Sequence, residues 1–313
     1  MVLNSTTIPL YWWEGFSGIP MAIKRSLNGK PAYISNFGDI LSPLIVSLLS
    51  KHQIKHSFAS HKLLAIGSIF FALRDHDYVW GSGLLNPSHI IFANRCRDVK
   101  YLAVRGPQTQ QLLIKNEIEC PTVYGDPAIL LPYLVRNDIP KRHQVGIISH
   151  YSHYVELSHR YSQDSSVKII NLEQPVEIVI RELLSCEIIL STSLHGVIIS
   201  EAYGIPTLML VNNQPLHGNI FKFTDYFNST DREVTFANIA QLNSINKLAD
   251  LALQKERPKF NPKPLLQAFP LETSIINLDL EPQLSWSTFA PEIFPTSKLP
   301  SLKTYLGLSH VIT

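Results

Sequence analysis

The sequence predicts an α/β protein with two domains, each built around a parallel sheet. Apolar runs typical of buried strands alternate with amphipathic helical segments of about ten residues, an order that favours parallel strands joined by right-handed crossovers. The 313 residues are about twice the usual length of one domain, and 45% hydrophobic and 17% charged residues are ordinary for a globular protein. A polar, proline-containing stretch at 137–142 is the predicted linker. We therefore expect one domain at residues 1–139, a second at 140–270 and an irregular proline-rich tail at 271–313.

Composition argues against several classes of function. The 27 basic and 25 acidic residues give a formal net charge of +2, and the absence of a basic run predicts no nucleic-acid partner. The three cysteines lie far apart without metal-binding spacing, so we expect reduced thiols and no metal. The amino terminus does not resemble a secretory signal, and no apolar run is long enough to span a membrane. We expect a cytoplasmic protein, with peripheral contact with the inner membrane face left open by its aromatic residues.

The first half is predicted to contain strands at 10–13, 62–69, 78–84, 90–94 and 101–104, helices at 40–49 and 108–116, and a last strand that begins at 122 and ends at a Gly-Asp-Pro turn. Asn36 and Asp39 precede or open the first of these helices. They either cap it or present polar groups to a substrate.

Small residues and one arginine follow the predicted strands of this half. Glycines in the segment Gly81-Ser82-Gly83 would let a ligand approach the backbone at the edge of the sheet. Arg105 follows a strand and precedes a helix, which suits a two-pronged grip on a phosphate or carboxylate. The ordinary alternative for a lone arginine is a surface ion pair.

The second half repeats the alternation, with predicted strands at 145–149, 167–171, 188–191 and 207–211 and helices at 154–161, 176–185 and 236–255. Within 188–211 the order is strand, turn, helix, strand, and His195 lies where the helix begins. Ligands bind at such carboxyl ends of parallel strands, and the unpaired N–H groups of a helix start attract anions. His195 is therefore the first candidate for chemistry, against the alternative that it only caps its helix.

Seven short motifs occur in one order between Asn36 and Tyr226: Asn-Phe-Gly-Asp at 36–39, Val-Trp-Gly-Ser-Gly at 79–83, Val-Arg-Gly-Pro at 104–107, Gly-Asp-Pro at 125–127, Gly-Ile-Ile-Ser-His-Tyr at 146–151, the Ser-Leu-His-Gly to Gly-Ile-Pro segment within 191–206, and 221–226. Each motif is weak alone, whereas seven in register are specific. In this combination the chain resembles the polysaccharide pyruvyl transferase family, and within it the shorter bacterial members. The resemblance implies a GT-B-like architecture, in which two Rossmann-type domains face each other across a cleft.

The resemblance also implies an activity. Such an enzyme transfers the pyruvyl unit of phosphoenolpyruvate to two hydroxyls of a sugar, forms a cyclic pyruvate ketal on a bacterial surface polysaccharide or its precursor, and releases phosphate. No cofactor is expected besides this donor, and the sugar acceptor is either free or lipid-linked. Because phosphoenolpyruvate carries a phosphate and a carboxylate, the residues expected to bind it are Arg105, Ser193, Leu194, Gly196 and Lys222.

The same chemistry needs groups that donate and accept protons. His195 is expected to protonate the enol carbon, because histidine holds a proton near neutral pH. His150 ends a strand that faces the same cleft, and we rank it ahead of Glu201 and Asp126 as the group that activates the sugar hydroxyl. The residues expected to bind the acceptor are Asn36, Asp39, Gly81, Ser82, Gly83 and Glu201.

The chain departs from the family at one position. Many members carry arginine immediately before Leu-His-Gly, where this chain has Ser193, so one anion contact is missing or comes from another residue, Lys222 being the first choice. Two other functions stay open. One is a GT-B glycosyltransferase that uses a nucleotide sugar, with Glu201 on the ribose. The other is a non-catalytic protein that binds an anionic glycan.

Overall fold

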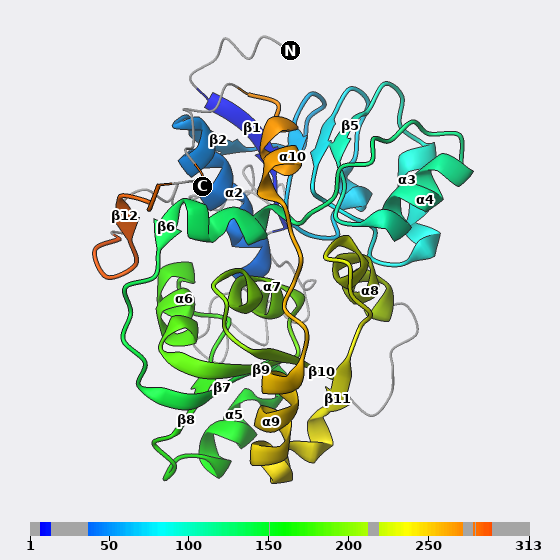
Figure 1. Ribbon diagram of the computed structural model, residues 1–313. Coiled ribbons are helices and arrows are strands. Elements are labelled where there is room, and N and C mark those ends of the chain that lie inside the picture. The colour runs from blue at the N-terminus through cyan, green and yellow to red at the C-terminus, as the bar shows by residue number, and fades with distance from the viewer. Residues whose placement is uncertain are drawn as a thin grey trace, which may run out of the picture.

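The structure, a computed structural model, describes residues 7–13, 37–149, 151–211, 219–271, 278 and 280–289, and within them the chain forms a mixed α/β fold with two five-stranded parallel sheets (Figure 1). The first sheet has the order β2-β1-β3-β4-β5 and consists of β1 (Thr7–Tyr11), β2 (Gln53–His56), β3 (Leu63–Leu64), β4 (Tyr78–Trp80) and β5 (Lys100–Ala103). The predicted parallel α/β class is thus confirmed for the first half, although the expected strand at 62–69 is reduced to β3.

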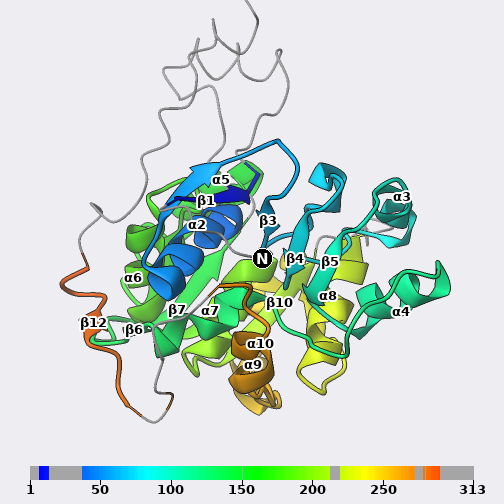
Figure 2. The same cartoon turned by 90° about the horizontal axis from the view of Figure 1, so that it is seen from above.

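Helices of the first half are α2 (Phe37–Ser50), α3 (Ile90–Asn94) and α4 (Pro107–Lys115), and Figure 2 shows α3 and α4 beyond the β5 edge of the sheet. The helix α2 buries the apolar face that its sequence period predicts. The predicted strand at 90–94 is wrong, because this segment is α3. Of its residues only Ala93 is buried, and an apolar run of five residues has no period that separates a strand from a helix.

The second sheet has the order β11-β10-β9-β7-β8 and consists of β7 (His143–Ile148), β8 (Val167–Ile170), β9 (Cys186–Ser191), β10 (Thr207–Val211) and β11 (Phe236–Asn238). Its helices are α5 (Tyr151–Arg160), α6 (Val176–Leu184), α7 (Leu194–Ala202), α8 (Asn219–Ser229) and α9 (Ile245–Gln254). The predicted order of strand, turn, helix and strand over 188–211 is confirmed by β9, α7 and β10. The single helix predicted at 236–255 is instead β11, a 3₁₀ segment (Ile239–Ser244) and α9, because Asn238 forms a capping box that starts a new turn.

The two halves share one hydrophobic core. Helix α2 packs against α6 and α7, and buried side chains of both sheets join in the same cluster. Helix α10 (Pro262–Gln267) returns to the first sheet, where the indole of Trp80 donates a hydrogen bond of 2.8 Å to the carbonyl of Leu265 (Figure 1). The expected domain division therefore stays a prediction, since residues from beyond 260 complete the packing of the first half.

The described part of the expected tail is ordered against the body. Strand β12 (Leu284–Ser285) pairs in parallel with β6 (Val135–Arg136), and Trp286 is fully buried with its indole donating to Tyr203 Oη at 2.6 Å. Apart from the two residues of β12, residues 280–289 form turns and irregular backbone, and the expected tail at 271–313 stays a prediction. Among the described residues, no helix has the length and apolar character needed to cross a membrane.

Candidate active site

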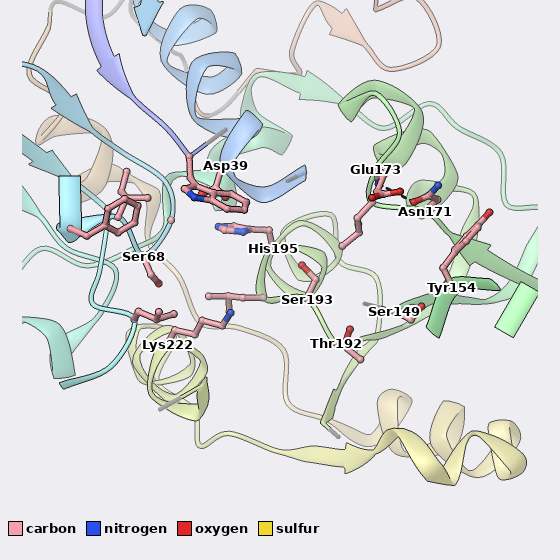
Figure 3. Close-up of a pocket in the computed structure, with 17 residues that line it drawn as sticks. Asp39, Ser68, Ser149, Tyr154, Asn171, Glu173, Thr192, Ser193, His195 and Lys222 are labelled. Carbon is pink, nitrogen blue, oxygen red and sulfur yellow. Dashed lines mark hydrogen bonds between the residues drawn. The ribbon is translucent and has the colours of Figure 1, made fainter. Parts of the chain in front are cut away.

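A cavity of about 490 Å³ opens at the carboxyl ends of strands from both sheets. Figure 3 shows the side chains that line it. In the first half they come from the segments that follow β1, β3 and β4 and from the start of α2. In the second half they come from the segments that follow β7, β8 and β9, from the start of α7, and from α5 and α8. The carboxyl ends of parallel strands are where open α/β folds bind ligands. Of the residues predicted from the sequence, those in this cavity are Asp39, Ser193, Leu194, His195 and Lys222.

His195 lies in the first turn of α7 and is 9% exposed. Its Nε2 is 3.4 Å from Oδ2 of Asp126, a fully buried carboxylate whose other oxygen accepts a hydrogen bond from the Ala128 backbone. The imidazole also packs against the backbone of α2, because a Cβ added at Gly38 would lie 1.8 Å from Nδ1 of His195. Glycine at this position therefore allows the two helix starts to approach each other.

Asp39 lies in the first turn of α2, and the residue is 6% exposed. Burial raises the pKa of Asp39 to about 7, against the opposing effects of His195 and Lys222. Gly67 makes room for this carboxylate: its φ of +106° suits glycine, and a Cβ there would lie 2.6 Å from Oδ1 of Asp39. A carboxyl group that exchanges its proton near neutral pH is suited to acid–base chemistry.

Lys222 lies on α8 and supplies positive charge to the cavity. Burial and the nearby Arg105 lower its pKa, whereas Asp39 raises it. Its Nζ lies 5.2 Å from the centre of the Phe223 ring, and among the described residues it makes no ion pair. It is therefore placed to meet an anionic group of a ligand.

Arg105 lies beneath the cavity rather than on its surface. It is fully buried and donates to Ser68 Oγ at 2.8 Å and to the Leu84 carbonyl at 2.5 Å, while its Nη2 is 3.1 Å from Oδ2 of Asp225. The contact of Arg105 with the cavity wall is through the hydroxyl of Ser68, which lines the cavity, and its charge lowers the pKa of Lys222. The predicted two-pronged grip on an anion is not formed by the side chain in this position.

The segment at 81–83 also supports the site from behind. Ser82 Oγ donates to the Gly67 carbonyl at 2.8 Å, and a Cβ at Gly83 would lie 2.8 Å from the guanidinium carbon of Arg105. Gly81 has a φ of +90° and faces Pro127. None of these three residues lines the cavity, so their predicted contact with an acceptor stays a prediction.

Glu201 lies in the last turn of α7, away from the cavity. Its carboxylate accepts hydrogen bonds from Arg232 at 2.9 and 2.7 Å and from Tyr226 Oη at 2.9 Å. The carboxylate is therefore occupied by protein groups, which also removes the support for a contact with a ribose.

The turn before α7 explains the serine at 193. Ser193 is the N-cap residue, and its Oγ accepts from Gly196 N at 3.4 Å. Gly196 itself is buried against Ser191 and Ile148 and does not line the cavity, whereas Leu194 and His195 do. Asn36 and His150, predicted to bind the acceptor and to act as the base, lie outside the described residues.

The sequence did not lead us to predict the polar residues of the second half that line the cavity. Ser149, Tyr154, Asn171 and Thr192 line the cavity, and three of them immediately follow strands β7, β8 and β9. The signal that could have found them is this shared position after consecutive parallel strands. Among the described residues, no three His, Cys, Asp or Glu side chains are grouped as they would be around a metal ion.

Fold and cavity together define a class: Rossmann-like α/β proteins with a cavity at the strand ends that is lined by ionisable side chains. A model of the family "Polysaccharide pyruvyl transferase" matches residues 36–214, more than half of the chain, and the chain belongs to this family. It is also 28% identical over 170 residues to "Uncharacterized protein L143" of Acanthamoeba polyphaga mimivirus. That match covers 51% of this chain and 57% of the viral protein, so the chain spans little more than half of this relative's length.

Proposed function

We propose that this chain transfers the pyruvyl unit of phosphoenolpyruvate to two hydroxyls of a sugar during polysaccharide biosynthesis, forming a cyclic ketal. The observation that carries the proposal is the convergence of His195, Asp39 and Lys222 on one cavity in a member of this family. A GT-B-like cleft between two domains, at 1–139 and 140–270, is part of the proposal, and the lining of the cavity by both halves supports it.

The donor would bind through its two anionic groups. Lys222 offers a charged contact, and the N-terminal ends of α2 and α7 both open near the cavity, where their N–H groups favour anions. Lys222 thus takes the place that other members give to an arginine before Leu-His-Gly. No further cofactor is required by this chemistry.

The reaction needs one proton added to carbon, two protons removed from the sugar hydroxyls and three changes of C–O bonds. His195 gives a proton to the methylene carbon of phosphoenolpyruvate, and Asp126 stabilises the imidazolium beforehand. The first sugar oxygen bonds to the central carbon while Asp39 takes its proton. The bond from that carbon to the phosphate oxygen then breaks, and the second hydroxyl closes the ketal. The proton that Asp39 takes from the first hydroxyl passes to His195 and restores both groups, and the proton of the second hydroxyl leaves with phosphate.

Asp39 enters this scheme because the structure places it in the cavity with a pKa near neutrality. His150, the base expected from the sequence, remains an alternative for the same role. The acceptor, free or lipid-linked, would lie against the hydroxyl and amide groups of Ser149, Asn171 and Thr192. A cytoplasmic location with access to a membrane-bound precursor fits this acceptor.

Mass spectrometry of sugars incubated with phosphoenolpyruvate and the protein tests the proposal directly. We expect the acceptor to gain one pyruvate ketal as phosphate is released. A sugar transferred from a nucleotide sugar, together with thermal stabilisation by that nucleotide but not by phosphoenolpyruvate, would replace the proposal with a glycosyltransferase. Binding of anionic glycans without phosphate release, over galactose, glucose, mannose and amino-sugar acceptors, would replace it with a binding protein.

A further inference from the structure

Aromatic side chains, one half-buried and two exposed, extend from the cavity along the carboxyl edge of the first sheet. Trp13 follows β1, Phe58 follows β2, and Phe71 lies in a 3₁₀ turn after β3. Because the sheet order places β1 between β2 and β3, these three segments are neighbours in space. Trp13 and Phe71 line the cavity, whereas Phe58 lies beyond it. We call Trp13, Phe71 and Phe58 the aromatic strip.

The strip is held in place from beneath. The buried ring of Tyr11 contacts Phe71 edge to face at 6.0 Å between ring centres and contacts Phe58 in the same manner at 5.5 Å. His56 packs on Phe58 at 4.8 Å, and its Nε2 is 2.9 Å from the Trp12 carbonyl. These contacts fix the rings, yet Phe58 is 64% and Phe71 38% exposed. Rigid aromatic faces left in water next to a ligand cavity are typical of a binding surface.

We propose that the aromatic strip binds the glycan chain of the acceptor, with one sugar ring in the cavity and the next along the chain on Phe58. The inference rests on the proposed function, because it takes the ligand to be the sugar acceptor. It adds that the acceptor is an oligosaccharide or longer glycan rather than a single sugar, since the strip continues past the cavity.

The chemistry of a sugar ring matches the two walls. A pyranose has one face of C–H groups, which carry slight positive charge and pack on the negative face of an aromatic ring. Its hydroxyls point outward and need hydrogen-bond partners, which Asn171 and Thr192 offer on the opposite wall. The residues that flank Phe58, at 57, 59 and 60, are serine or alanine, but exposed Lys55 and His61 lie three residues away on either side. Because basic side chains beside an exposed aromatic ring also suit an anionic lipid surface, the test below includes vesicles.

Binding measured without phosphoenolpyruvate tests the inference. The probes are methyl glycosides of galactose, glucose and mannose and the neutral tetrasaccharides built from the same sugars, titrated calorimetrically. We expect one tetrasaccharide to bind the native protein more tightly than its methyl glycoside. Phe58→Ala should weaken that tetrasaccharide about fivefold and leave the methyl glycoside unchanged, because one stacking contact is lost. Phe58→Trp should retain the affinity.

Phe236→Ala is the matched control, because Phe236 is an aromatic residue with 46% exposure on β11 that does not line the cavity. Equal affinity of tetrasaccharide and methyl glycoside, or equal weakening by both alanine variants, would overturn the inference. So would sedimentation of the native protein, but not of Phe58→Ala, with vesicles of equal parts phosphatidylethanolamine and phosphatidylglycerol in the absence of glycan binding.

Phosphate release from phosphoenolpyruvate, measured in parallel, separates the two proposals. Tetrasaccharide binding that depends on Phe58, without phosphate release by the native protein, would support the strip and count against the proposed function. Phosphate release whose dependence on acceptor length is the same in Phe58→Ala and in the native protein would support the function and refute the strip.

Discussion

Helix α7 carries two buried ionisable side chains whose surroundings differ. Glu201, in its last turn, has hydrogen bonds from Arg232 and Tyr226. His195, in its first turn, faces Asp126 at 3.4 Å, and within the described residues neither its Nε2 nor the facing Oδ2 has a hydrogen bond. Buried polar groups are usually paired, because each missing bond costs about 1–3 kcal/mol. The carboxylate at the end of α7 therefore has hydrogen bonds within the protein, whereas the polar groups at its start are available to a ligand.

Replacing the histidine gives the largest expected effect. In His195→Ala, kcat for phosphate release should fall by about 10²- to 10⁴-fold, because a positioned proton donor is lost. The free energy of unfolding should also fall, because the buried carboxylate of Asp126 loses the facing imidazole, so urea denaturation is needed to show that the variant is folded under the assay conditions. Near-normal turnover would end its assignment as the acid, and complete loss in Asp39→Asn alone would move that role to Asp39.

A substitution in the last turn of α7 should lower the stability of the protein rather than its activity. In Glu201→Ala we expect the free energy of unfolding in urea to fall by about 3–5 kcal/mol, because Arg232 is left buried without a counter-charge. The folded variant should keep its kcat. Adding Arg232→Met should recover part of the stability. Lost activity at unchanged stability would instead return Glu201 to the acceptor site.

Arg105 is the intermediate case, predicted from sequence to bind the donor yet buried beside Asp225. We expect Arg105→Met to lower the free energy of unfolding by about 3 kcal/mol and to leave KM for phosphoenolpyruvate nearly unchanged. Urea denaturation and steady-state kinetics measure the two quantities. A large rise in KM with unchanged stability would show that the side chain reaches the donor.

Lys222 belongs with His195 in this comparison, because it lines the cavity without an ion pair in the described residues. Lys222→Met should raise KM for phosphoenolpyruvate about tenfold, since one charged contact with the donor is removed. Lys255→Met is the matched control: Lys255 is half-buried like Lys222 and lies over the Phe227 ring at 4.8 Å, but it is outside the cavity. Equal effects of the two substitutions would exclude a specific role.

The smallest effect concerns pH. Burial raises the pKa of Asp39 to about 7, so the base form grows between pH 7 and 8 and the rate should rise about twofold, a rise that Asp39→Asn lacks. Because the folded state holds this proton more tightly than the unfolded state, stability from Asp39 is full below about pH 4 and is lost as pH rises through about 7. Melting temperatures of Asp39→Asn should lack this decline. A decline identical to that of the native protein would contradict the assignment.

The sequence predicted most where the relevant contacts are local. The strand at 207–211 and the helix start at His195 follow from apolar period, glycine, proline and a capping serine, all within a few residues. The family was likewise recognised from short motifs and is confirmed by the match over 36–214. At 90–94 the prediction failed, because an apolar run of five residues is too short to distinguish the period of a helix from that of a strand.

By itself, the sequence determined the alternation of strands and helices, the parallel sheets and the place of His195 at the start of α7. Only the tertiary structure decided which polar residues share the cavity. Arg105 and Glu201 look like site residues in sequence, but their partners Asp225 and Arg232 come from distant parts of the chain. Asp39 gains its neutral-range pKa only because folding buries it beside the segment that follows another strand. Pairing and desolvation of buried charges depend on such distant neighbours, which a local pattern does not contain.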